Sequence, residues 1–152
     1  MSGLVMVNNT DIWGSYGAFL YEEKPGKRLN LDALFSAAKM KDHVAVDIRE
    51  QNGEKYSSQL TQKKCARDVT LHFAIYAPSS SDFVTRYSGF LAFLRTGSNG
   101  WLTFNFPTLG LTLNKMYVKE MPGGFSSISD LWHPGEQCGA FKVTFREPVS
   151  SF

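Results

Sequence analysis

The chain has 152 residues, of which 43% are hydrophobic and 14% aromatic, so it can form one domain around a sizeable core. Its 16 basic and 14 acidic residues give a formal net charge of only +2, which argues against nucleic-acid binding through bulk electrostatics. No apolar stretch reaches the roughly 18 residues of a membrane span, and the N-terminal residues lack the basic and apolar regions of a signal peptide.

Cys65 and Cys138 are the two cysteines of the chain. Two cysteines cannot build a disulfide framework, and their spacing does not match the CxxC pattern of redox and metal sites. The sequence leaves a single bridge between them open, but a reducing compartment is the simpler expectation. We therefore expect the protein to be made and folded in a cytoplasm.

The first part of the chain predicts short extended pieces separated by turns. The stretch "LVMVNNTDIW" (4–13) is typical of a strand that ends in a turn at Asn8-Asn9, because asparagine tolerates the left-handed backbone region. The stretch "SYGAFLYEE" (15–23) predicts a second extended piece. In "LNLDALFSAAKM" (29–40), apolar residues fall at helical spacing, which favours one or two helical turns.

The next segment predicts a hairpin. In "HVAVDIRE" (43–50), valine or isoleucine occupies every second position, which is the period of a half-buried strand. A polar stretch that contains Asn52-Gly53 follows, and Asn-Gly is the preferred pair for a two-residue hairpin turn. We expect residues 44 to about 64 to form this hairpin, with its outer part projecting from the body.

The centre of the chain contains the clearest strand and the clearest helix. The stretch "RDVTLHFAIYA" (67–77) alternates apolar and polar positions and ends before Pro78, which cannot donate to a ladder. Ser79 followed by Asp82 resembles a helix capping box, and Gly97 is a natural left-handed helix end. Between them, an apolar stripe at helical spacing consists of Phe83, Tyr87, Phe90, Leu91 and Leu94.

Three further strands are predicted after the helix, in "WLTFNF" (101–106), "LTLNKMYVKEM" (111–121) and "AFKVTFREP" (140–148). This order of elements predicts an α+β fold, a mostly antiparallel β-sandwich or split barrel with one flanking α-helix at about residues 80–96. We expect residues 1–152 to form a single domain, because the sequence shows neither an internal repeat nor a linker.

The stretch "DLWHPGEQCGAF" is rich in residues that bind metals or transfer protons. It contains Asp130, His133, Glu136 and Cys138, but the spacing HxxExC matches no common zinc pattern. A nucleophilic Cys138 would need a base nearby and a lowered pKa, and no motif supports its pairing with His133 or His72. We interpret the stretch as a turn that leads the last strand into the core, and we predict no metal, cofactor or catalytic site.

Other residues give weaker signals for chemistry. Carboxylates for glycoside hydrolysis are available at Asp47, Asp68, Glu120 and Glu136, but nothing in the sequence selects a pair. The glycine-rich stretches "TGSNG" and "PGG" lack the strand-then-helix context of a phosphate loop. Several aromatic residues could form a stacking platform, although burial in the core is the favoured interpretation. These are Trp101, Phe104, Tyr117, Phe125 and Trp132.

Several stretches, in the order in which they occur, resemble phage distal tail proteins. "VNNTDIWGSYGAFL" resembles the opening strands of that family, and "KMKDHVAVDIREQNGEKY" resembles its strand and polar hairpin. "CARDVTLHFAIYAPSSSDFVTRYSGFLAFLRTG" is similar to its strand, helix and glycine, and "AFKVTFREP" to its closing strand. Tail-tube and type VI secretion-tube proteins share a similar plan. Longer distal tail proteins have a second, C-terminal domain without a counterpart here, so the resemblance favours the ring-forming unit over a receptor- or carbohydrate-binding role.

The resemblance implies a non-enzymatic structural component of a phage or prophage tail. Such subunits form rings, commonly of six, around a central channel and contact other phage tail proteins. The resemblance implies the virion tail as the location, after synthesis in the bacterial host cytoplasm, with no cofactor, membrane or sequence-specific nucleic acid. As a hypothesis, residues 49–64 join subunits by strand addition at a sheet edge. The predicted subunit-contact residues are Gln51, Asn52, Gly53, Glu54, Lys55, Tyr56, Trp132 and His133.

Two other classes of function are left open by the residues alone. One is a β-sandwich module that binds carbohydrate or peptide with Trp132 and its neighbours, which predicts a monomer with an aromatic-lined groove. The other is a small hydrolase, which predicts that His133, Glu136 and Cys138 converge in space with His72. A ring subunit predicts a large oligomer instead.

Overall fold

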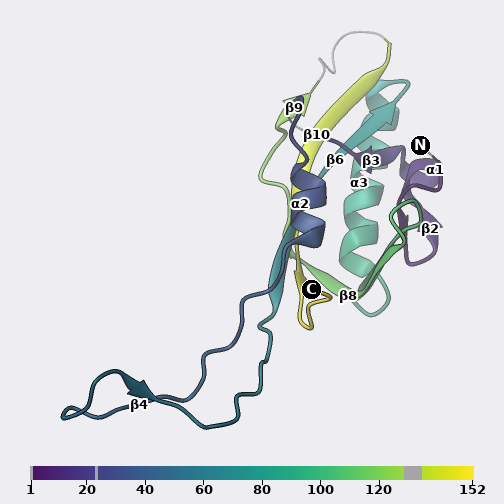
Figure 1. The fold of residues 1–152 in the computed structure, drawn as a ribbon. Coiled ribbons are helices and arrows are strands. Elements are labelled where there is room, and N and C mark those ends of the chain that lie inside the picture. The colour runs from purple at the N-terminus through teal and green to yellow at the C-terminus, as the bar shows by residue number, and fades with distance from the viewer. Residues whose placement is uncertain (1, 23, 129–134) are drawn as a thin grey trace.

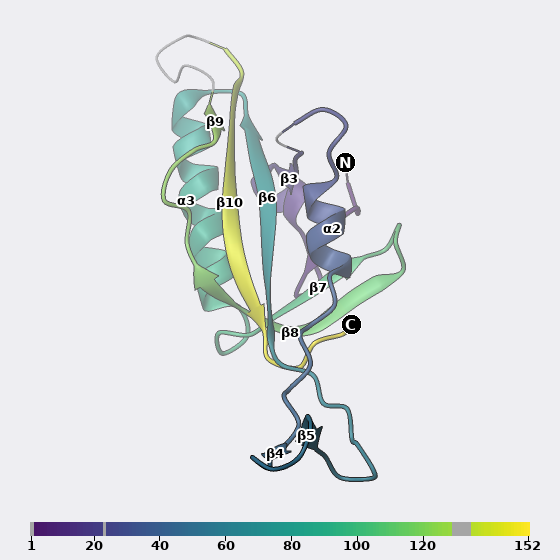
Figure 2. The same cartoon turned by 60° about the vertical axis from the view of Figure 1, so that its left-hand side comes forward.

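The computed structural model describes residues 2–22, 24–128 and 135–152. Figures 1 and 2 show a curled antiparallel sheet that forms a half-barrel, with helices packed on it and a long arm that extends away from it. The helices are α1 (Ile12–Tyr16), α2 (Leu29–Phe35) and α3 (Ser80–Thr96). The strands are β1 (Met6–Val7), β2 (Thr10–Asp11), β3 (Ala18–Leu20), β4 (Val46–Asp47), β5 (Glu54–Lys55), β6 (Arg67–Ala77), β7 (Leu102–Phe106), β8 (Leu111–Glu120), β9 (Ser127–Ile128) and β10 (Gln137–Glu147). The predicted α+β class with a mostly antiparallel sheet is confirmed.

The main sheet has the strand order β2-β1-β7-β8-β10-β6-β3, and β9 pairs with β10 beside this path. All of these pairs are antiparallel. The longest ladder joins β6 to β10, from Gln137 opposite Ala77 to Glu147 opposite Arg67. The strands predicted from the alternation of apolar and polar residues at 67–77 and 140–148 are confirmed as β6 and β10. Because β2 and β3 stand at the two ends of the order, the sheet curls without closing into a barrel.

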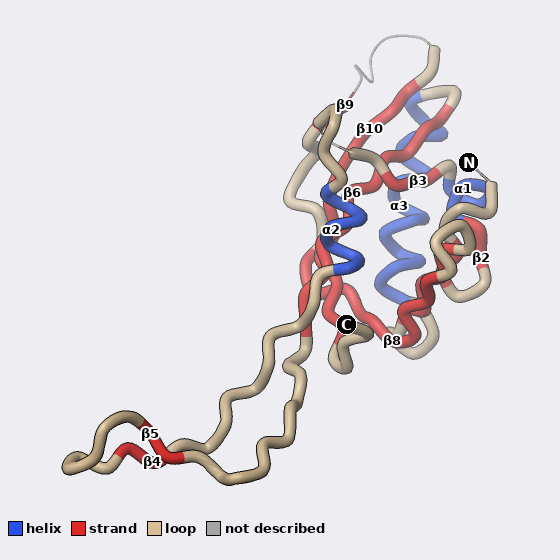
Figure 3. The backbone as a smooth tube through the Cα atoms, in the orientation of Figure 1, coloured by secondary structure: helices blue, strands red, loops and turns tan. Residues whose placement is uncertain are grey.

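The predicted flanking helix is α3, which lies across the inner face of the curled sheet (Figure 3). The hydroxyl of Ser79 caps its N-terminus by accepting a hydrogen bond from the backbone N–H of Asp82 at 3.2 Å. The helix buries Phe90 and Leu94, and the Phe90 ring lies 5.3 Å from that of Phe73 on β6. Burial stabilises such side chains by about 1.5–3 kcal/mol each, so α3 is fixed to the sheet mainly by its apolar stripe. No described helix has both the length and the apolar character that a membrane crossing needs.

Residues 12–16 form a helical turn where the sequence was expected to lead directly into an extended piece. The carboxylate of Asp11 caps this turn by accepting a hydrogen bond from the N–H of Trp13 at 3.1 Å. Gly17 ends it with a φ of +63°, and a Cβ there would lie 2.5 Å from the carbonyl oxygen of Tyr76. Apolar alternation did not reveal this turn, because its signals are the two cap residues and not the residues between them.

The prediction of a half-buried strand at residues 44–48 is wrong. Only the short strands β4 and β5 pair there, and Val44 is 89% exposed. The loop between them comprises residues 48–53, so Asn52-Gly53 does not form a two-residue turn. The alternation has no buried face to occupy, because this segment lies on the arm, away from the core (Figure 3).

Two of the predicted turns can be compared with backbone angles. Asn8 and Asn9 have φ values of 50° and 64°, which confirms the turn between β1 and β2. Gly97 does end α3, but its φ of 48° is combined with a ψ of −144°, outside the left-handed helical region. The chain reverses there at once, with the N–H of Ser98 donating to the carbonyl of Trp101 at 2.9 Å.

Candidate functional site

The arm, defined as residues 40–64, is the largest feature outside the half-barrel (Figure 1). A bridge between Met40 and Lys64 closes its base, where the N–H of Lys41 also donates to the carbonyl of Lys63 at 2.7 Å. From this base to Gln51 the backbone can span up to roughly 40 Å. By comparison, a compact domain of 152 residues has a radius of gyration of roughly 15 Å. The arm can therefore reach well beyond its own body.

The arm exposes both its polar and its apolar side chains. Of its residues, only His43 and Ile48 are half-buried, and the others are exposed. The predicted contact residues 51–56 all lie on its outer part and are exposed. Trp132 and His133, the remaining predicted contact residues, lie outside the described residues. The large exposed apolar side chains of the arm are Met40, Val44, Val46, Tyr56 and Leu60.

Tyr56 and Glu54 are held together on the outer part of the arm. The Tyr56 hydroxyl donates a hydrogen bond to the Glu54 carboxylate at 2.5 Å. This bond, together with the negative charge of Glu54, raises the pKa of Tyr56 above its usual value. The Tyr56 ring also meets the edge of the His43 ring, with centroids 6.5 Å apart. These contacts join the two sides of the arm close to the predicted contact residues.

A buried ion pair lies where the arm joins the body. Arg67, at the start of β6, donates from Nε to the carboxylate of Glu147 at 2.9 Å, and the two side chains are only 4% and 2% exposed. The same guanidinium donates to the carbonyls of Leu34 and Ser36, at 3.0 and 2.5 Å, at the C-terminal end of α2. Glu147 also accepts from the N–H of Ser151 at 2.6 Å. The ion pair therefore links the chain segments just before and just after the arm to the end of β10.

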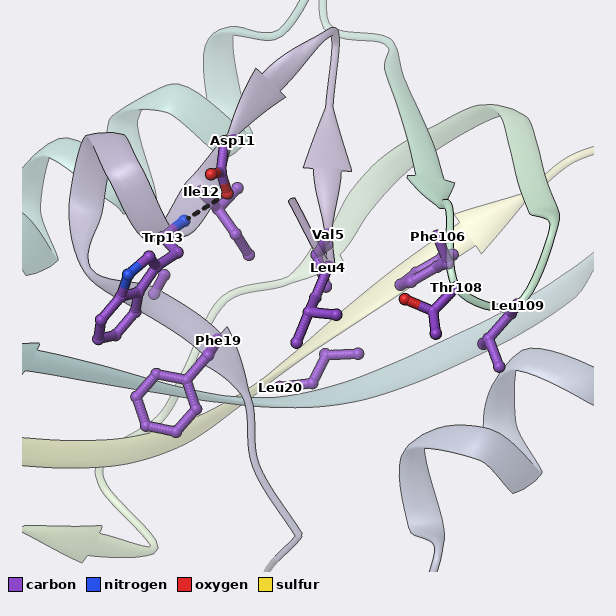
Figure 4. A pocket seen from close by; sticks show the side chains of 11 residues that line it. Leu4, Val5, Asp11, Ile12, Trp13, Phe19, Leu20, Phe106, Thr108 and Leu109 are labelled. Carbon is purple, nitrogen blue, oxygen red and sulfur yellow. Dashed lines mark hydrogen bonds between the residues drawn. The ribbon is translucent and has the colours of Figure 1, made fainter. Parts of the chain in front are cut away.

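A second feature lies where the two ends of the curled sheet approach each other. An apolar groove of about 260 Å³ opens there between the β1–β2 hairpin, α1, β3 and the turn after β7 (Figure 4). We call it the seam groove. The residues that line it include Leu4, Ile12, Trp13, Phe19, Leu20 and Leu109. Leu4 and Leu109 are 48% and 43% exposed at its rim, while Ile12 is buried at its base.

The one acidic residue among those that line the seam groove, Asp11, is occupied by local hydrogen bonds. Its carboxylate accepts from the Gly3 N–H, the Ser2 hydroxyl and the Trp13 N–H, each at 3.1 Å (Figure 4 shows the last). Partial burial raises the pKa of Asp11, but these hydrogen bonds outweigh it, and the net pKa is below its usual value. The groove is therefore suited to apolar side chains.

Among the described residues, Cys138 and His72 do not come together as a hydrolase would need. Cys138 lies in β10 opposite Tyr76, whereas His72 lies opposite Lys142, four residues or about 14 Å further along the ladder. Burial raises the pKa of the Cys138 thiol, which is the opposite of what a nucleophile requires. The Glu136 carboxylate accepts from the Tyr76 hydroxyl and raises the pKa of Tyr76. Asp130 and His133 lie outside the described residues, and the described ones form no cluster suited to a metal.

The four carboxylates named as candidates for glycoside hydrolysis do not gather at one site, although Glu120 is exposed at the end of β8, opposite Thr144 in the stretch of β10 that also pairs with Asp68. Asp47 is exposed on the arm, and Glu136 is bonded to Tyr76 at the far end of β10. Asp68 is paired with Lys119 at 2.6 Å and Arg146 at 2.9 Å on the outer surface. A carboxylate held by two cations serves charge pairing at a surface rather than proton transfer.

The aromatic residues considered as a stacking platform do not share one surface. Phe104 is fully buried, as the favoured interpretation predicted. Trp101 and Tyr117 pack edge to face at 5.8 Å and are partly exposed. Phe125 belongs to a different cluster, with its ring 5.0 Å from Tyr87 of α3. Trp132 lies outside the described residues.

The seam groove was not found from the sequence. Its apolar residues were interpreted as members of ordinary strands, and that interpretation gives them no role beyond the core. The groove depends on which strands end the sheet, and strand order cannot be read from alternation. A usable signal was the concentration of Trp13, Phe19 and Leu20 around a short strand next to a glycine.

No protein-family model matches the sequence, and no curated protein matches it by sequence. The fold is similar to that in the crystal structure of the SPP1 Dit (gp 19.1) protein, with a TM-score of 0.55 and 13% sequence identity. The match covers 95% of this chain and 50% of that one, so this chain spans about half the length of the SPP1 protein. The SPP1 protein is described as a paradigm of the hub adsorption apparatus in phages that infect Gram-positive bacteria. At this identity the likeness establishes a shared fold.

Proposed function

We propose that this chain is a non-enzymatic structural subunit of a phage or prophage tail, and that its copies form a ring around a central channel. The observation that carries the proposal is the fold shared with SPP1 Dit over 95% of the chain, because that protein belongs to a hub adsorption apparatus. The same likeness favours a place at the distal end of the tail over a place in the tube. The location would then be the virion tail, after synthesis in the bacterial cytoplasm.

The arm supports an assembly role independently of the shared fold. It carries Val44, Val46 and Tyr56 on a segment that its own body does not cover. Apolar side chains left uncovered on a projecting segment are available for contact with another protein. An arm of one subunit that contacts the body of the next gives a head-to-tail interface, and such interfaces close into rings when the rotation between subunits allows. A ring of six chains of 17.0 kDa would have a mass of about 102 kDa.

The outer part of the arm is the proposed subunit contact. Residues 51–56 are exposed, and β5 within them already has an extended backbone suited to strand addition. The pair Glu54–Tyr56 fixes one tyrosine ring in place, which lowers the entropy lost when a neighbour binds it. Trp132 and His133 remain predicted members of the contact from the sequence alone.

Deletion of residues 52–60 tests this proposal. The deletion removes β5 but leaves the base of the arm, β6 and the core, so the body should keep its circular dichroism spectrum and its melting temperature. We expect multi-angle light scattering to find an oligomer for the full chain, whose monomer has a mass of 17.0 kDa. The deleted chain should form a smaller species, with the monomer as the limit. An unchanged assembly state in the deleted chain would contradict a subunit contact through residues 51–56.

A binding module is the second candidate function, and the seam groove is the observation in its favour. The groove contains Trp13 and Phe19 and is almost wholly apolar. Such a lining suits apolar peptide side chains better than the hydroxyl groups of a carbohydrate. This candidate predicts a monomer at all concentrations, so the light-scattering measurement on the full chain also separates the two functions.

A further inference from the structure

We propose that the seam groove of one copy binds the segment 44–48 of the arm of another copy. This inference rests on the proposed function and adds to it a second contact of the arm, separate from the one proposed for residues 51–56. It commits to a second copy of this chain as the occupant of the groove.

The segment 44–48 has the pattern of a strand that has one face to bury. Val44, Val46 and Ile48 point to the same side of an extended chain, while Ala45 and Asp47 point to the other. In the single chain this apolar face is largely uncovered, with Val44 89% and Val46 54% exposed. The alternation of apolar and polar residues would be explained if this segment paired with a sheet that buries its apolar face. The arm itself contains no such sheet.

The seam groove offers the complementary surface. It is apolar and about 260 Å³ in volume, and two of its rim residues, Leu4 and Leu109, are half exposed. A buried Val side chain occupies a fraction of this volume, so the groove can accept more than one side chain of an extended segment. Among the described residues that line the groove none is cationic, and the one carboxylate among them, that of Asp11, already accepts three hydrogen bonds.

The backbone beside the groove also favours an added strand. β3 is the last strand of the sheet, so one of its edges faces away from β6. The carbonyl of Gly17 accepts from the N–H of Tyr76 at 3.0 Å, and the N–H of Tyr21 donates to the carbonyl of His72 at 2.9 Å. In an antiparallel ladder this alternation directs the backbone groups of Ala18, between those two positions, away from β6 and toward the groove side. An extended segment seated there could continue the sheet.

The arm of the same chain does not supply the occupant. Its base is fixed by the Met40–Lys64 bridge, and from there it runs away from the body. Figure 1 places the arm and α1, which lines the groove, at different ends of the molecule. A contact between the arm of one copy and the groove of the next leaves a free groove and a free arm on every pair, so it propagates until a ring closes.

Cysteine cross-linking tests the contact. In a Cys65→Ser, Cys138→Ser background, Val46→Cys is combined with Leu109→Cys at the groove rim. Mild oxidation should then produce a ladder of dimers, trimers and larger species on a non-reducing gel. The matched control combines Val46→Cys with Val84→Cys, an exposed residue of α3 that does not line the groove, and should stay monomeric on the gel.

A pair of arm substitutions gives a second readout. Val44→Asp places a charge on the apolar face of the segment, whereas Ala45→Asp places the same charge on the opposite face. We expect Val44→Asp to raise the concentration needed for assembly at least tenfold in light scattering, and Ala45→Asp to leave it within about twofold, since surface changes outside a contact have small effects.

The outcomes separate this inference from the proposed function. If the full chain assembles but the Val46–Leu109 pair cross-links no better than the Val46–Val84 control, the groove is not the partner of the arm, while the ring proposal stands. If the full chain remains a monomer at every concentration and the Val46–Leu109 variant yields no ladder, both proposals fail.

Discussion

Loss of one partner of the buried ion pair between Arg67 and Glu147 should destabilise the fold more than loss of one partner of the exposed pairs at Asp68. Removing two charges from water is costly, and the guanidinium here offsets part of that cost by bonding to Glu147 and to the carbonyls of Leu34 and Ser36, while its buried Nη2 has no partner among the described residues. The Phe152 ring lies over the guanidinium at 5.4 Å. Removing one partner leaves an uncompensated buried charge at the point where the arm begins.

We therefore expect Glu147→Gln to lower the free energy of unfolding by about 3–5 kcal/mol, measured by urea denaturation. The matched control is Asp68→Asn, which removes an exposed carboxylate paired with Lys119 and Arg146. That change should cost no more than about 1 kcal/mol. An equal loss in the two variants would contradict the structural role assigned to the buried pair.

The Asp68 control also has a defined pH dependence. The hydrogen bond from Lys119, helped by Arg146, holds the pKa of Asp68 below its usual value of 3.8. A lowered folded-state pKa stabilises the fold above the unfolded-state pKa, and this contribution is lost as the pH falls through the lowered value. The difference between wild type and Asp68→Asn should therefore be present at neutral pH and disappear in strong acid.

Position 143 tests the interpretation of the loop before β10 as a lead-in to the core. Val143 is fully buried in β10, whereas Val149, just after that strand, is 85% exposed. Val143→Asp buries an unpaired charge and should prevent cooperative folding, while Val149→Asp should leave the thermal transition nearly unchanged. Thermal melts followed by circular dichroism measure both. A larger effect at position 149 would mean that the end of the chain, not β10, holds the sheet together.

At the scale of elements, α1 and the seam groove depend on a close backbone approach at Gly17. A Cβ at this position would lie 2.5 Å from the Tyr76 carbonyl oxygen, which belongs to β6 and cannot move without disturbing the main ladder. Gly110, in the turn between β7 and β8, has the same φ of +63° but nothing within 4 Å of the corresponding Cβ position. An alanine at position 110 therefore measures the free-energy cost of the backbone angle alone, whereas an alanine at position 17 adds the cost of the close contact.

Gly110→Ala should lower the free energy of unfolding by about 1–2 kcal/mol, the cost of a left-handed backbone for an L-residue. Gly17→Ala should lower it by that amount and more, because the chain must also move away from Tyr76. Chemical denaturation of the two variants gives the comparison. Equal losses would show that the close approach does not constrain α1.

The elements also show what the sequence could predict. β6, α3 and β10 were found because each buries one regular face, and a buried face imposes a period on the sequence. The segment 44–48 has the same period, but its apolar face is uncovered in the single chain. The alternation was therefore read correctly from the sequence, whereas the prediction that this face is buried was wrong. α1 was missed because five residues between Asp11 and Gly17 are too few to show helical periodicity.

The candidate site was only partly predictable for a related reason. The arm was expected to project, and its exposed residues 51–56 can be named from the sequence because they are polar and follow a strand-like stretch. The seam groove arises from the meeting of β1, α1 and β3 at the open side of the sheet. That meeting depends on strand order and curl, which are set by contacts between residues distant in sequence and leave no local period.

At the scale of the whole molecule, the half-barrel and the arm have different physical characters. The half-barrel has a continuous aromatic core, with Phe73 in contact with Phe90, Phe141 and Phe145. The arm has no core of its own and is attached through its base and the buried ion pair. The exposed, partly apolar arm on a packed body supports the proposed assembly of copies of this chain into a ring.

Negative-stain electron microscopy of the purified full chain can show directly whether its copies form a ring. We expect closed rings with a central channel, with six as the expected number of subunits, at concentrations where light scattering finds the oligomer. Open filaments would contradict ring closure, and single particles of one chain at every concentration would contradict self-assembly itself.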